Sequence, residues 1–322
     1  MIDTGEVSLR CAIEGPEPGT APLAIMVHGF PESWYSWRHQ LAPVAAAGFT
    51  ACAIDVRGYG GSDKPQPVAA YAMERLVGDL VALTKALSPD GQAVLIGHDW
   101  GAPIVWNSTL ARPDTFRAVA ALSVPFVGVP SRPFTEVFRE HFTAKGRFFY
   151  QEYFQAEGIA EAEAEADPRA FIRRMMVSIA GDAPEGNPWD KPHGASFLDG
   201  LPDPAEPDGL PGWLTPADLD FYTNEFAVSG FRGPLNRYRN HERDYEWLQQ
   251  FKDRRIEAPA LFIGGSRDPA TTLFGAVADP VALTRMFVPR VEGHVLEGCG
   301  HWTQQERPHE VNALLVDWLG RV

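Results

Sequence analysis

The sequence predicts an α/β protein with a mostly parallel, doubly wound sheet, helices on both faces and a helical insertion. Short apolar segments without alternation, typical of strands covered on both faces, take turns with segments of helical spacing. This pattern stops after residue 128 and resumes near residue 245. We therefore expect one core, residues 1–128 and 245–322, interrupted by a helical cap or lid, residues 129–244.

The first part of the core contains four apolar runs and two amphipathic segments. The predicted strands are 23–28 ("LAIMVH"), 50–55 ("TACAID"), 93–98 ("AVLIGH") and 118–124 ("AVAALSV"). The predicted helices are 33–48 and 71–87. A strand followed by a helix and another strand is the unit from which parallel sheets are built.

The predicted cap has helical stretches and no segment typical of a buried strand. The helical stretches are 131–155, 167–181 and 216–230, and the alternating Ala and Glu residues of 159–167 predict a solvated helix face. A long Pro/Gly-rich segment, 182–215, is expected to form a lid, a pocket wall or a disordered loop. Its tryptophans, Trp189 and Trp213, favour a wall that packs on other residues.

The second part of the core returns to the earlier alternation. Segment 259–265 predicts a strand, 279–287 a helix, 291–300 the last strand and 309–320 the last helix. The core and the cap together account for the whole chain without an internal repeat.

Composition limits the classes of partner. The 322 residues carry a formal net charge of −14, which argues against nucleic acid as a partner. The three scattered cysteines predict neither a disulfide framework nor a metal site, which favours a reducing compartment. The first residues do not look like a signal peptide, and no run reaches the roughly 18 apolar residues of a membrane span. We expect a cytoplasmic protein without a metal or other cofactor.

The segment "LIGHDWGAPIVW" (95–106) joins a predicted strand to a predicted helix through a turn with Asp99 at its centre. Gly97 and Gly101 flank it, as small residues flank a nucleophile elbow, where a strained turn lifts one side chain above a sheet. The alternative is that Asp99 only caps the following helix. The strand-to-helix context favours the elbow, with Asp99 as a nucleophile.

An aspartate nucleophile indicates a particular chemistry. A carboxylate that attacked a carbonyl would give a reactive anhydride, whereas attack on a saturated carbon gives an ordinary ester. Epoxides and alkyl halides offer such carbons. Asp99 therefore argues against a lipase, an esterase or a peptidase, and it needs a histidine only to activate water for hydrolysis of the ester.

His301 and Asp268 follow Asp99 in the order nucleophile, acid, base that elbow enzymes use. Asp268 lies just after a predicted strand, and His301 lies in a glycine-bordered turn, so both belong to loops at the carboxyl edge of the sheet. Asp279 is the rival acid, but it stands at a helix start, where Asp is common. His28 and His98 flank the site and are expected to orient loops, whereas His241 and the remaining histidines show no partner pattern.

The segment "HGFPESW" (28–34) follows the first predicted strand, in the place of the loop that supplies an oxyanion donor. We expect the backbone N–H groups of Phe30 and Trp100 to point at one oxygen, which becomes an oxyanion when the Asp99 ester is hydrolysed. The alternative is a simple tight turn. The sequence leaves open whether the Phe30–Pro31 bond is cis.

Several motifs resemble one known family. They are "HGFPESWYSWRHQ" (28–40), "DVRGYGGSDKP" (55–65), "GHDWG" (97–101), "GFRGPLNRYRN" (230–240) and "GCGHWTQQERPHEVN" (298–312). From about residue 21 to the C-terminus the chain resembles the epoxide hydrolases of the α/β-hydrolase superfamily, in particular the hydrolase domain of the mammalian soluble enzyme. Haloalkane dehalogenases share "GHDWG".

The resemblance implies an α/β-hydrolase fold and two cap tyrosines that hold the epoxide oxygen. The matching positions are Tyr150 and Tyr238. A phenol with an ordinary pKa near 10 stays protonated at neutral pH and can donate to a developing alkoxide. The chain departs from the family pattern at Arg237, where relatives often carry Trp, and at Ser123, where Asn is common.

The expected function is conversion of an epoxide to a vicinal diol through an ester on Asp99, which water activated by His301 then hydrolyses. The expected partners are a small apolar epoxide and water, with substrate contacts at Pro31, Trp34 and Phe126. The alternatives are a haloalkane dehalogenase and a non-catalytic ligand-binding protein with this fold, and a serine esterase fits least. The sequence also leaves room for a homo-oligomer.

Overall fold

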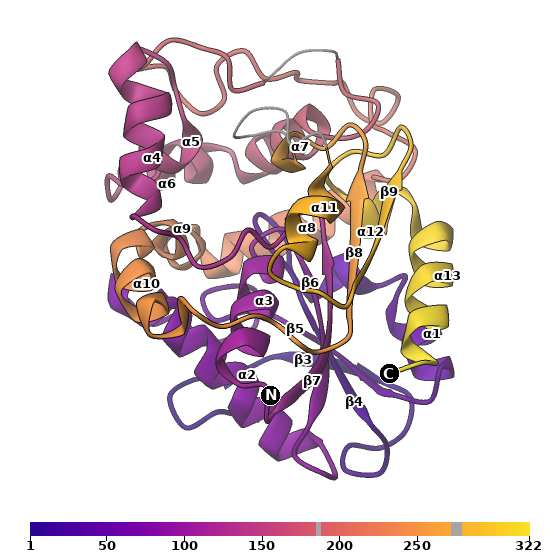
Figure 1. Ribbon diagram of the computed structural model, residues 1–322. Helices are drawn as coiled ribbons and strands as arrows, with labels where there is room; N and C mark the ends of the chain where they lie inside the picture. Colours follow the sequence, from indigo (N-terminus) through magenta and orange to yellow (C-terminus); the bar gives the residue numbers. More distant parts are fainter. Residues whose placement is uncertain (185–187, 272–278) are drawn as a thin grey trace.

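A seven-stranded sheet forms the centre of the molecule, in the order β3-β5-β4-β6-β7-β8-β9 (Figure 1). The computed structural model describes residues 1–184, 188–271 and 279–322. All neighbouring strands are parallel except β3 and β5, which pair antiparallel. The strands are β3 (Cys11–Glu14), β4 (Leu23–Val27), β5 (Thr50–Ile54), β6 (Ala93–His98), β7 (Phe116–Leu122), β8 (Ala260–Gly265) and β9 (Val291–Leu296).

The six strands expected from the sequence are present with shifts of a few residues at their ends. The edge strand β3 was not indicated by the pattern, because its residues are half-buried and it pairs along one side only. A separate ribbon of β1 (Ile2–Asp3) and β2 (Ser8–Leu9) also escaped the pattern, since each strand has only two residues.

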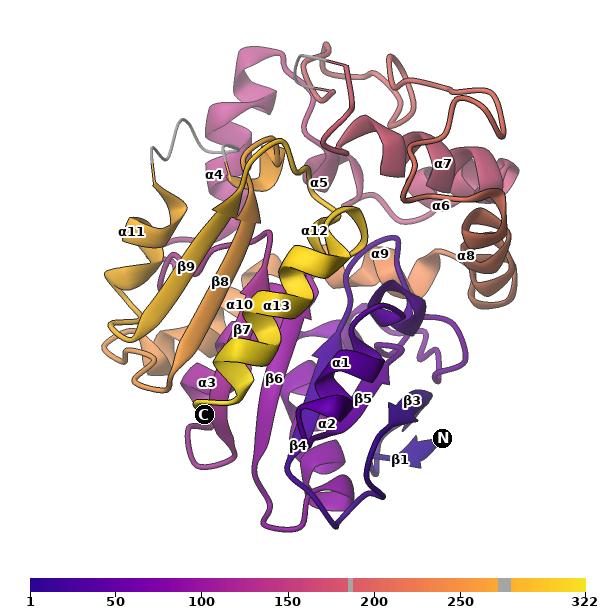
Figure 2. The ribbon, with the colours of Figure 1, turned by 90° about the vertical axis from the view of Figure 1, so that its right-hand side faces the viewer.

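Helices cover both faces of the sheet, and alternate strand residues explain why. In β4, Leu23, Ile25 and Val27 belong to one apolar cluster with α2 (Met73–Leu87), α3 (Gly101–Ala111) and residues between β7 and β8. Ala24 and Met26 point to the other face and pack with α1 (Leu41–Ala46) and α13 (Pro308–Leu319). Figure 2 shows α1 and α13 side by side in front of the sheet, as their direct contact requires.

Between β7 and β8 the described chain is helical, as predicted. The helices are α4 (Phe134–His141), α5 (Tyr150–Tyr153), α6 (Ile159–Ala166), α7 (Pro168–Ser178), α8 (Pro216–Ser229), α9 (Arg232–Tyr238) and α10 (His241–Leu248). The stretch 131–155 is not one helix, because Gly146 adopts a left-handed φ of 70° between α4 and α5. Figure 1 shows α4 to α7 above the sheet, at the carboxyl ends of β6 and β8.

The described part of the Pro/Gly-rich segment packs as a wall. The Trp189 ring lies 5.1 Å from the Tyr150 ring and 5.0 Å from the Phe197 ring, measured between centroids. Arg169 and Arg173 of α7 form ion pairs with Glu206 in the same segment. Residues 185–187, also part of this segment, lie outside the described residues.

The expectation of a solvated face on 159–167 is wrong for Glu161. Its carboxylate is buried and accepts hydrogen bonds from both terminal nitrogens of Arg239, at 2.6 and 3.0 Å. Glu163 accepts from the Tyr153 hydroxyl and from the amides of Phe197 and Leu198. The alternation of Ala and Glu therefore fastens α6 to its neighbours.

The last described elements are α11 (Pro280–Arg285), β9, α12 (Thr303–Glu306) and α13. No helix among the described residues has the length and apolar character that a membrane crossing would require.

Candidate active site

The turn after β6 holds Asp99 in a strained conformation. Its φ is 50°, which non-glycine residues rarely adopt. A Cβ atom at Gly97 would lie 2.3 Å from the Gly101 carbonyl oxygen, and one at Gly101 would lie 2.0 Å from the Val27 carbonyl oxygen. Glycine is therefore required on both sides of Asp99, which gives the geometry of a nucleophile elbow.

The loop after β4 supplies a hydrogen bond to the Asp99 carboxylate. The Phe30 amide donates to Asp99 Oδ1 at 2.8 Å. Gly29 makes this approach possible, because a Cβ there would lie 2.2 Å from the same oxygen. The Phe30–Pro31 peptide bond is cis. The structure thus places one of the two expected oxyanion donors at the carboxylate, while the role of the Trp100 amide stays a prediction.

The His301 ring lies between Asp99 and Asp268, the two other residues of the predicted triad. Its Nε2 lies 3.3 Å from Asp99 Oδ2, and its Nδ1 lies 2.9 Å from Asp268 Oδ1. Asp268 is 1 % exposed. The rival Asp279 instead caps α11, with its carboxylate accepting from the amides of Val281 and Ala282.

Ser123, at the end of β7, bridges the acid and the base. Its hydroxyl donates to Asp268 Oδ2 at 2.5 Å and lies 2.9 Å from His301 Nδ1. Its φ of 73° is left-handed, a conformation that Asn tolerates better than Ser. Sequence reasoning identified Ser123 only as a departure from the family pattern and missed this contact.

These contacts shift the pKa values of Asp268 and His301 in opposite directions. Burial disfavours the charged form of Asp268, but the His301 ring and the Ser123 hydroxyl lower its pKa below the ordinary value. Burial likewise opposes charge on His301, but the Asp268 carboxylate, and then Asp99, raise its pKa well above the ordinary value. The two neighbouring carboxyl groups therefore favour a proton on His301 in the free site.

His28 and His98 orient loops, as expected. His28 Nε2 accepts from the Val56 amide at 3.1 Å. The two ring nitrogens of His98 lie 2.8 Å from Glu32 Oε2 and 2.7 Å from the His301 carbonyl oxygen. Glu32 also accepts from the Gly29 amide at 2.9 Å, so a single buried carboxylate connects the Phe30 loop with the His301 turn.

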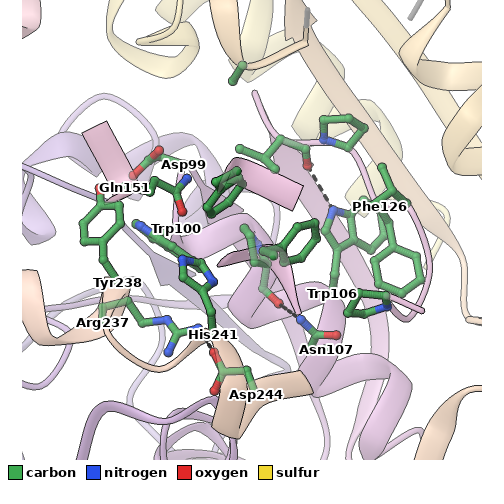
Figure 3. A pocket seen from close by; sticks show the side chains of 18 of the residues that line it. Asp99, Trp100, Trp106, Asn107, Phe126, Gln151, Arg237, Tyr238, His241 and Asp244 are labelled. Carbon is green, nitrogen blue, oxygen red and sulfur yellow. Dashed lines mark hydrogen bonds and ion pairs between the residues drawn. The ribbon is translucent and has the colours of Figure 1, made fainter. Parts of the chain in front are cut away.

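A cavity of about 270 Å³ is lined by Asp99, by His301 and by side chains of α4, α5, α9 and α10 (Figure 3). Its walls are mostly apolar, and Phe126 is among its lining residues, whereas its contact with a substrate stays a prediction. Pro31 and Trp34 are absent from the described lining. Trp34 instead packs against Tyr35 and Phe221, with ring centroids 5.9 and 5.8 Å away.

Tyr150 of α5 and Tyr238 of α9 line this cavity, with ring centroids 6.1 Å apart. Burial, and then the charge of Asp99, raise the pKa of both phenols above the ordinary value, so both stay protonated. The Gln151 side chain donates from Nε2 to the Tyr150 hydroxyl at 3.0 Å. The Trp100 ring packs edge-on against the Tyr238 ring, with centroids 5.2 Å apart. Because Gln151 donates to the Tyr150 hydroxyl, Tyr150 keeps its own proton for another acceptor.

Sequence reasoning missed Gln151 and His241 as cavity residues. Gln151 is the neighbour of a predicted tyrosine, but a single Gln carries no signal of its own. The one sequence signal was Arg237, a charged residue where relatives often carry Trp, which indicates a polar patch in the cavity wall near His241. In residues 1–184, 188–271 and 279–322, no three His, Cys, Asp or Glu side chains gather as a metal site would need.

Comparison with known proteins gives one family. The sequence profile of the α/β hydrolase fold matches residues 22–308. Epoxide hydrolase A of Mycobacterium tuberculosis is 42% identical over 99% of this chain and 96% of its own length. The bifunctional epoxide hydrolase 2 of Sus scrofa is 38% identical over 94% of this chain and 52% of its own length.

Solved structures agree with this family. An epoxide hydrolase from an endophytic Streptomyces has a TM-score of 0.88 and 45% identity, over 97% of this chain and 95% of that chain. Epoxide hydrolase A from Mycobacterium thermoresistibile has a TM-score of 0.89 and 41% identity, over 99% and 96%. With its elbow, its fold and these relatives, the chain belongs to the epoxide hydrolases of the α/β-hydrolase fold.

Proposed function

We propose that this protein converts epoxides to vicinal diols through a covalent ester on Asp99. One observation carries the proposal: the Asp99 carboxylate has the Phe30 amide on one oxygen and His301 Nε2 near the other, in a cavity that two protonated tyrosines also line. We further propose residues 129–244 as the cap that closes this cavity. The location in the cytoplasm stays a prediction.

In the first step an Asp99 oxygen attacks an epoxide carbon and the ring C–O bond breaks. The released oxygen takes a proton from Tyr150 or Tyr238. Because Gln151 donates to the Tyr150 hydroxyl, the proton of that hydroxyl is available to the epoxide oxygen. Residues that donate to the breaking bond in this way typically contribute about 10²–10⁴-fold to the rate.

In the second step water hydrolyses the ester. Formation of the ester removes the Asp99 charge, and with it one cause of the raised pKa of His301. His301 can then release its proton to restore the tyrosine. The neutral ring accepts a proton from water, and the hydroxide attacks the ester carbonyl, whose oxyanion the Phe30 amide stabilises. The tetrahedral intermediate then collapses, and the proton of its new hydroxyl group passes to the leaving oxygen. This step releases the diol and restores the Asp99 carboxylate, while His301 keeps the proton that it took from water.

The geometry favours an epoxide over an alkyl halide. A halide leaving group needs weak donors and no proton, so the two phenols would serve no purpose. The Trp100 indole, which could otherwise donate to a halide, packs edge-on against the Tyr238 ring, with centroids 5.2 Å apart.

The test measures diol formation from styrene oxide and bromide release from 1-bromobutane. We expect the wild-type protein to form the diol, Asp99→Ala to form none, and Tyr150→Phe with Tyr238→Phe to lose about 10²–10⁴-fold in kcat/KM. Tyr153→Phe and Asp279→Ala are the matched controls, because the Tyr153 hydroxyl bonds Glu163 and Asp279 caps a helix. Diol formation by Asp99→Ala would contradict the mechanism, and bromide release that survives both tyrosine changes would indicate a dehalogenase.

A further inference from the structure

Most polar side chains that line the cavity already have hydrogen-bond partners. Asn107 donates to the Pro103 carbonyl oxygen at 2.8 Å, and Asp244 accepts from the Met73 amide at 2.7 Å. Among the described residues of the cavity wall, three buried side-chain atoms have no partner. They are Gln151 Oε1, Arg237 Nε and His241 Nε2.

The Gln151 oxygen belongs to the reacting end of the cavity, because the same amide group supports Tyr150. Arg237 is held on three sides. Its NH1 donates to the Tyr71 carbonyl oxygen at 2.7 Å, its NH2 forms an ion pair with Asp244, and its guanidinium carbon lies 4.5 Å above the centroid of the Trp100 ring. His241 remains as a cavity group without an assigned task.

His241 is 4 % exposed and lies among aromatic rings. Its ring centroid is 6.0 Å from Trp100, 6.2 Å from Phe134 and 5.3 Å from Phe138. Figure 3 shows the imidazole extending from the start of α10 toward Trp100, near the Arg237–Asp244 pair. Trp100 also contacts Tyr238, with centroids 5.2 Å apart, so a single ring lies between His241 and Tyr238.

Burial, and then the positive charge of Arg237, lower the pKa of His241 to about 3. The imidazole is therefore neutral at physiological pH. A neutral imidazole has one N–H donor and one nitrogen acceptor. A buried polar atom that stays without a partner is unfavourable, so a ligand group that pairs with His241 Nε2 is favoured over an alkyl group.

We propose that His241 forms a second recognition point in this cavity, which selects epoxides whose chain carries an uncharged oxygen group, a hydroxyl or a carbonyl, away from the ring. This proposal rests on the proposed function, since it assigns the substrate class of the same site. The epoxide ring lies at Asp99, next to Tyr150 and Tyr238. The carbon chain of the substrate runs past Trp100 to His241 Nε2.

An uncharged group fits better than a carboxylate. The Arg237 guanidinium is already paired with Asp244, so a carboxylate in the substrate would be a second, unbalanced negative charge beside that pair. The formal net charge of −14 also disfavours the approach of anionic substrates.

The experiment compares matched probes. Terminal epoxides of five, six, eight and ten carbons that carry a hydroxyl at the far end, such as 7,8-epoxyoctan-1-ol, are paired with epoxyalkanes in which methyl replaces the hydroxyl, such as 1,2-epoxynonane. The acid 7,8-epoxyoctanoate is the charged probe. The readout is the ratio of kcat/KM between the members of each pair.

For the wild-type protein we expect the hydroxyl member to be preferred about five- to tenfold at one or more chain lengths, the effect of one net hydrogen bond. His241→Phe keeps an aromatic ring in the same packing and should abolish the preference, whereas His241→Gln keeps a donor and an acceptor and should retain part of it. Gln151→Leu is the matched control. It should slow both members of a pair alike, because it acts through Tyr150.

Equal turnover of the two members at every length would overturn the proposal while leaving the epoxide hydrolase function intact. Preference for the acid, or a preference that survives His241→Phe, would overturn it too. If the wild-type protein turned over none of the probes and also failed with styrene oxide, the proposed function itself would fall, and this inference with it.

Discussion

Ser123 shows how a single residue can connect the acid and the base of a site. Its hydroxyl donates to Asp268 and lies 2.9 Å from His301 Nδ1, although its φ of 73° is unfavourable for Ser. A residue in such a conformation persists only when its surroundings hold it there. We infer that Ser123 is a positioning residue for the second step, in which Asp268 must orient His301.

Ser123→Ala should therefore slow hydrolysis of the ester about tenfold, because it removes a hydrogen bond to a buried carboxylate, while the attack by Asp99 changes little. Single-turnover mass spectrometry separates the two steps, since it follows the rise and the decay of the ester. Equal slowing of both steps would indicate a purely structural role.

His241 also makes a prediction about stability and pH. Its pKa is about 3 in the folded protein, against roughly 6.5 in an unfolded chain. Because the pKa of His241 is lower in the folded state, the unfolded state binds a proton first as the pH falls. The free energy of unfolding therefore decreases as the pH falls from about 6.5 toward 3.

Between pH 7.5 and pH 5, the free energy of unfolding of the wild-type protein should fall by about 2 kcal/mol more than that of His241→Phe, which has no such proton to bind. Urea unfolding at the two pH values measures this difference. Parallel loss of stability in both proteins would show that His241 titrates normally.

At the scale of elements, the turn between β6 and α3 depends on close contacts that only glycine allows. A Cβ at Gly101 would lie 2.0 Å from the backbone of β4, which cannot move without disturbing the Phe30 loop. The sequence indicated this element well, because small residues on both sides of a reactive one, between an apolar strand and a helix, are typical of a nucleophile elbow. The sequence did not indicate β3, because this edge strand is half-buried and pairs along one side only. It also did not indicate the division of 131–155, which follows from the left-handed conformation of Gly146.

Gly101→Ala should lower the free energy of unfolding by about 3 kcal/mol or more, or prevent folding, through overpacking against Val27. Gly78→Ala is the matched control, because a Cβ there meets nothing within 4 Å and the residue is exposed in the interior of α2. That change should stabilise the protein by about 0.5–1 kcal/mol. Chemical denaturation of both variants measures the contrast, and similar losses in the two would contradict the need for glycine at the elbow.

At the scale of the whole molecule, the proposed cap contacts the core at the turn that carries His301. The His301 amide donates to the Ile179 carbonyl oxygen at 2.9 Å, and Trp302 Nε1 donates to the Met176 carbonyl oxygen at 2.7 Å. Glu306 accepts from the amides of Gly181 and Gly300, each at 2.9 Å. The end of α7 therefore holds the proposed base in place.

Glu306→Ala should lower the free energy of unfolding by about 2 kcal/mol and slow ester hydrolysis more than ester formation, because it leaves buried amides without an acceptor. Glu310→Ala, on the exposed side of α13, provides the comparison and should stay within about 0.5 kcal/mol. Thermal and urea unfolding, with the single-turnover assay, test both parts. A Glu306 variant that behaved like the Glu310 variant would show that this link carries little energy.

Sequence reasoning predicted the core, the helical nature of the insertion and the three residues that the structure brings together at Asp99. Each of these depends on local patterns or on residue order along the chain. Sequence reasoning did not predict contacts between distant segments. These are the contacts of Ser123 with Asp268 and of Glu161 with Arg239, and the position of His241 in the cavity wall. Such contacts form between segments that are far apart in the sequence, which no local pattern records.

The most direct test of the central claim is the intact mass of His301→Gln after exposure to styrene oxide. This variant should complete the attack and stall before hydrolysis, so we expect a gain equal to one whole epoxide on the peptide that contains Asp99. A parallel sample with 1-bromobutane should show no adduct. An unmodified protein, from a preparation whose wild-type form produces the diol, would contradict the ester on Asp99, and so would an adduct on any other residue.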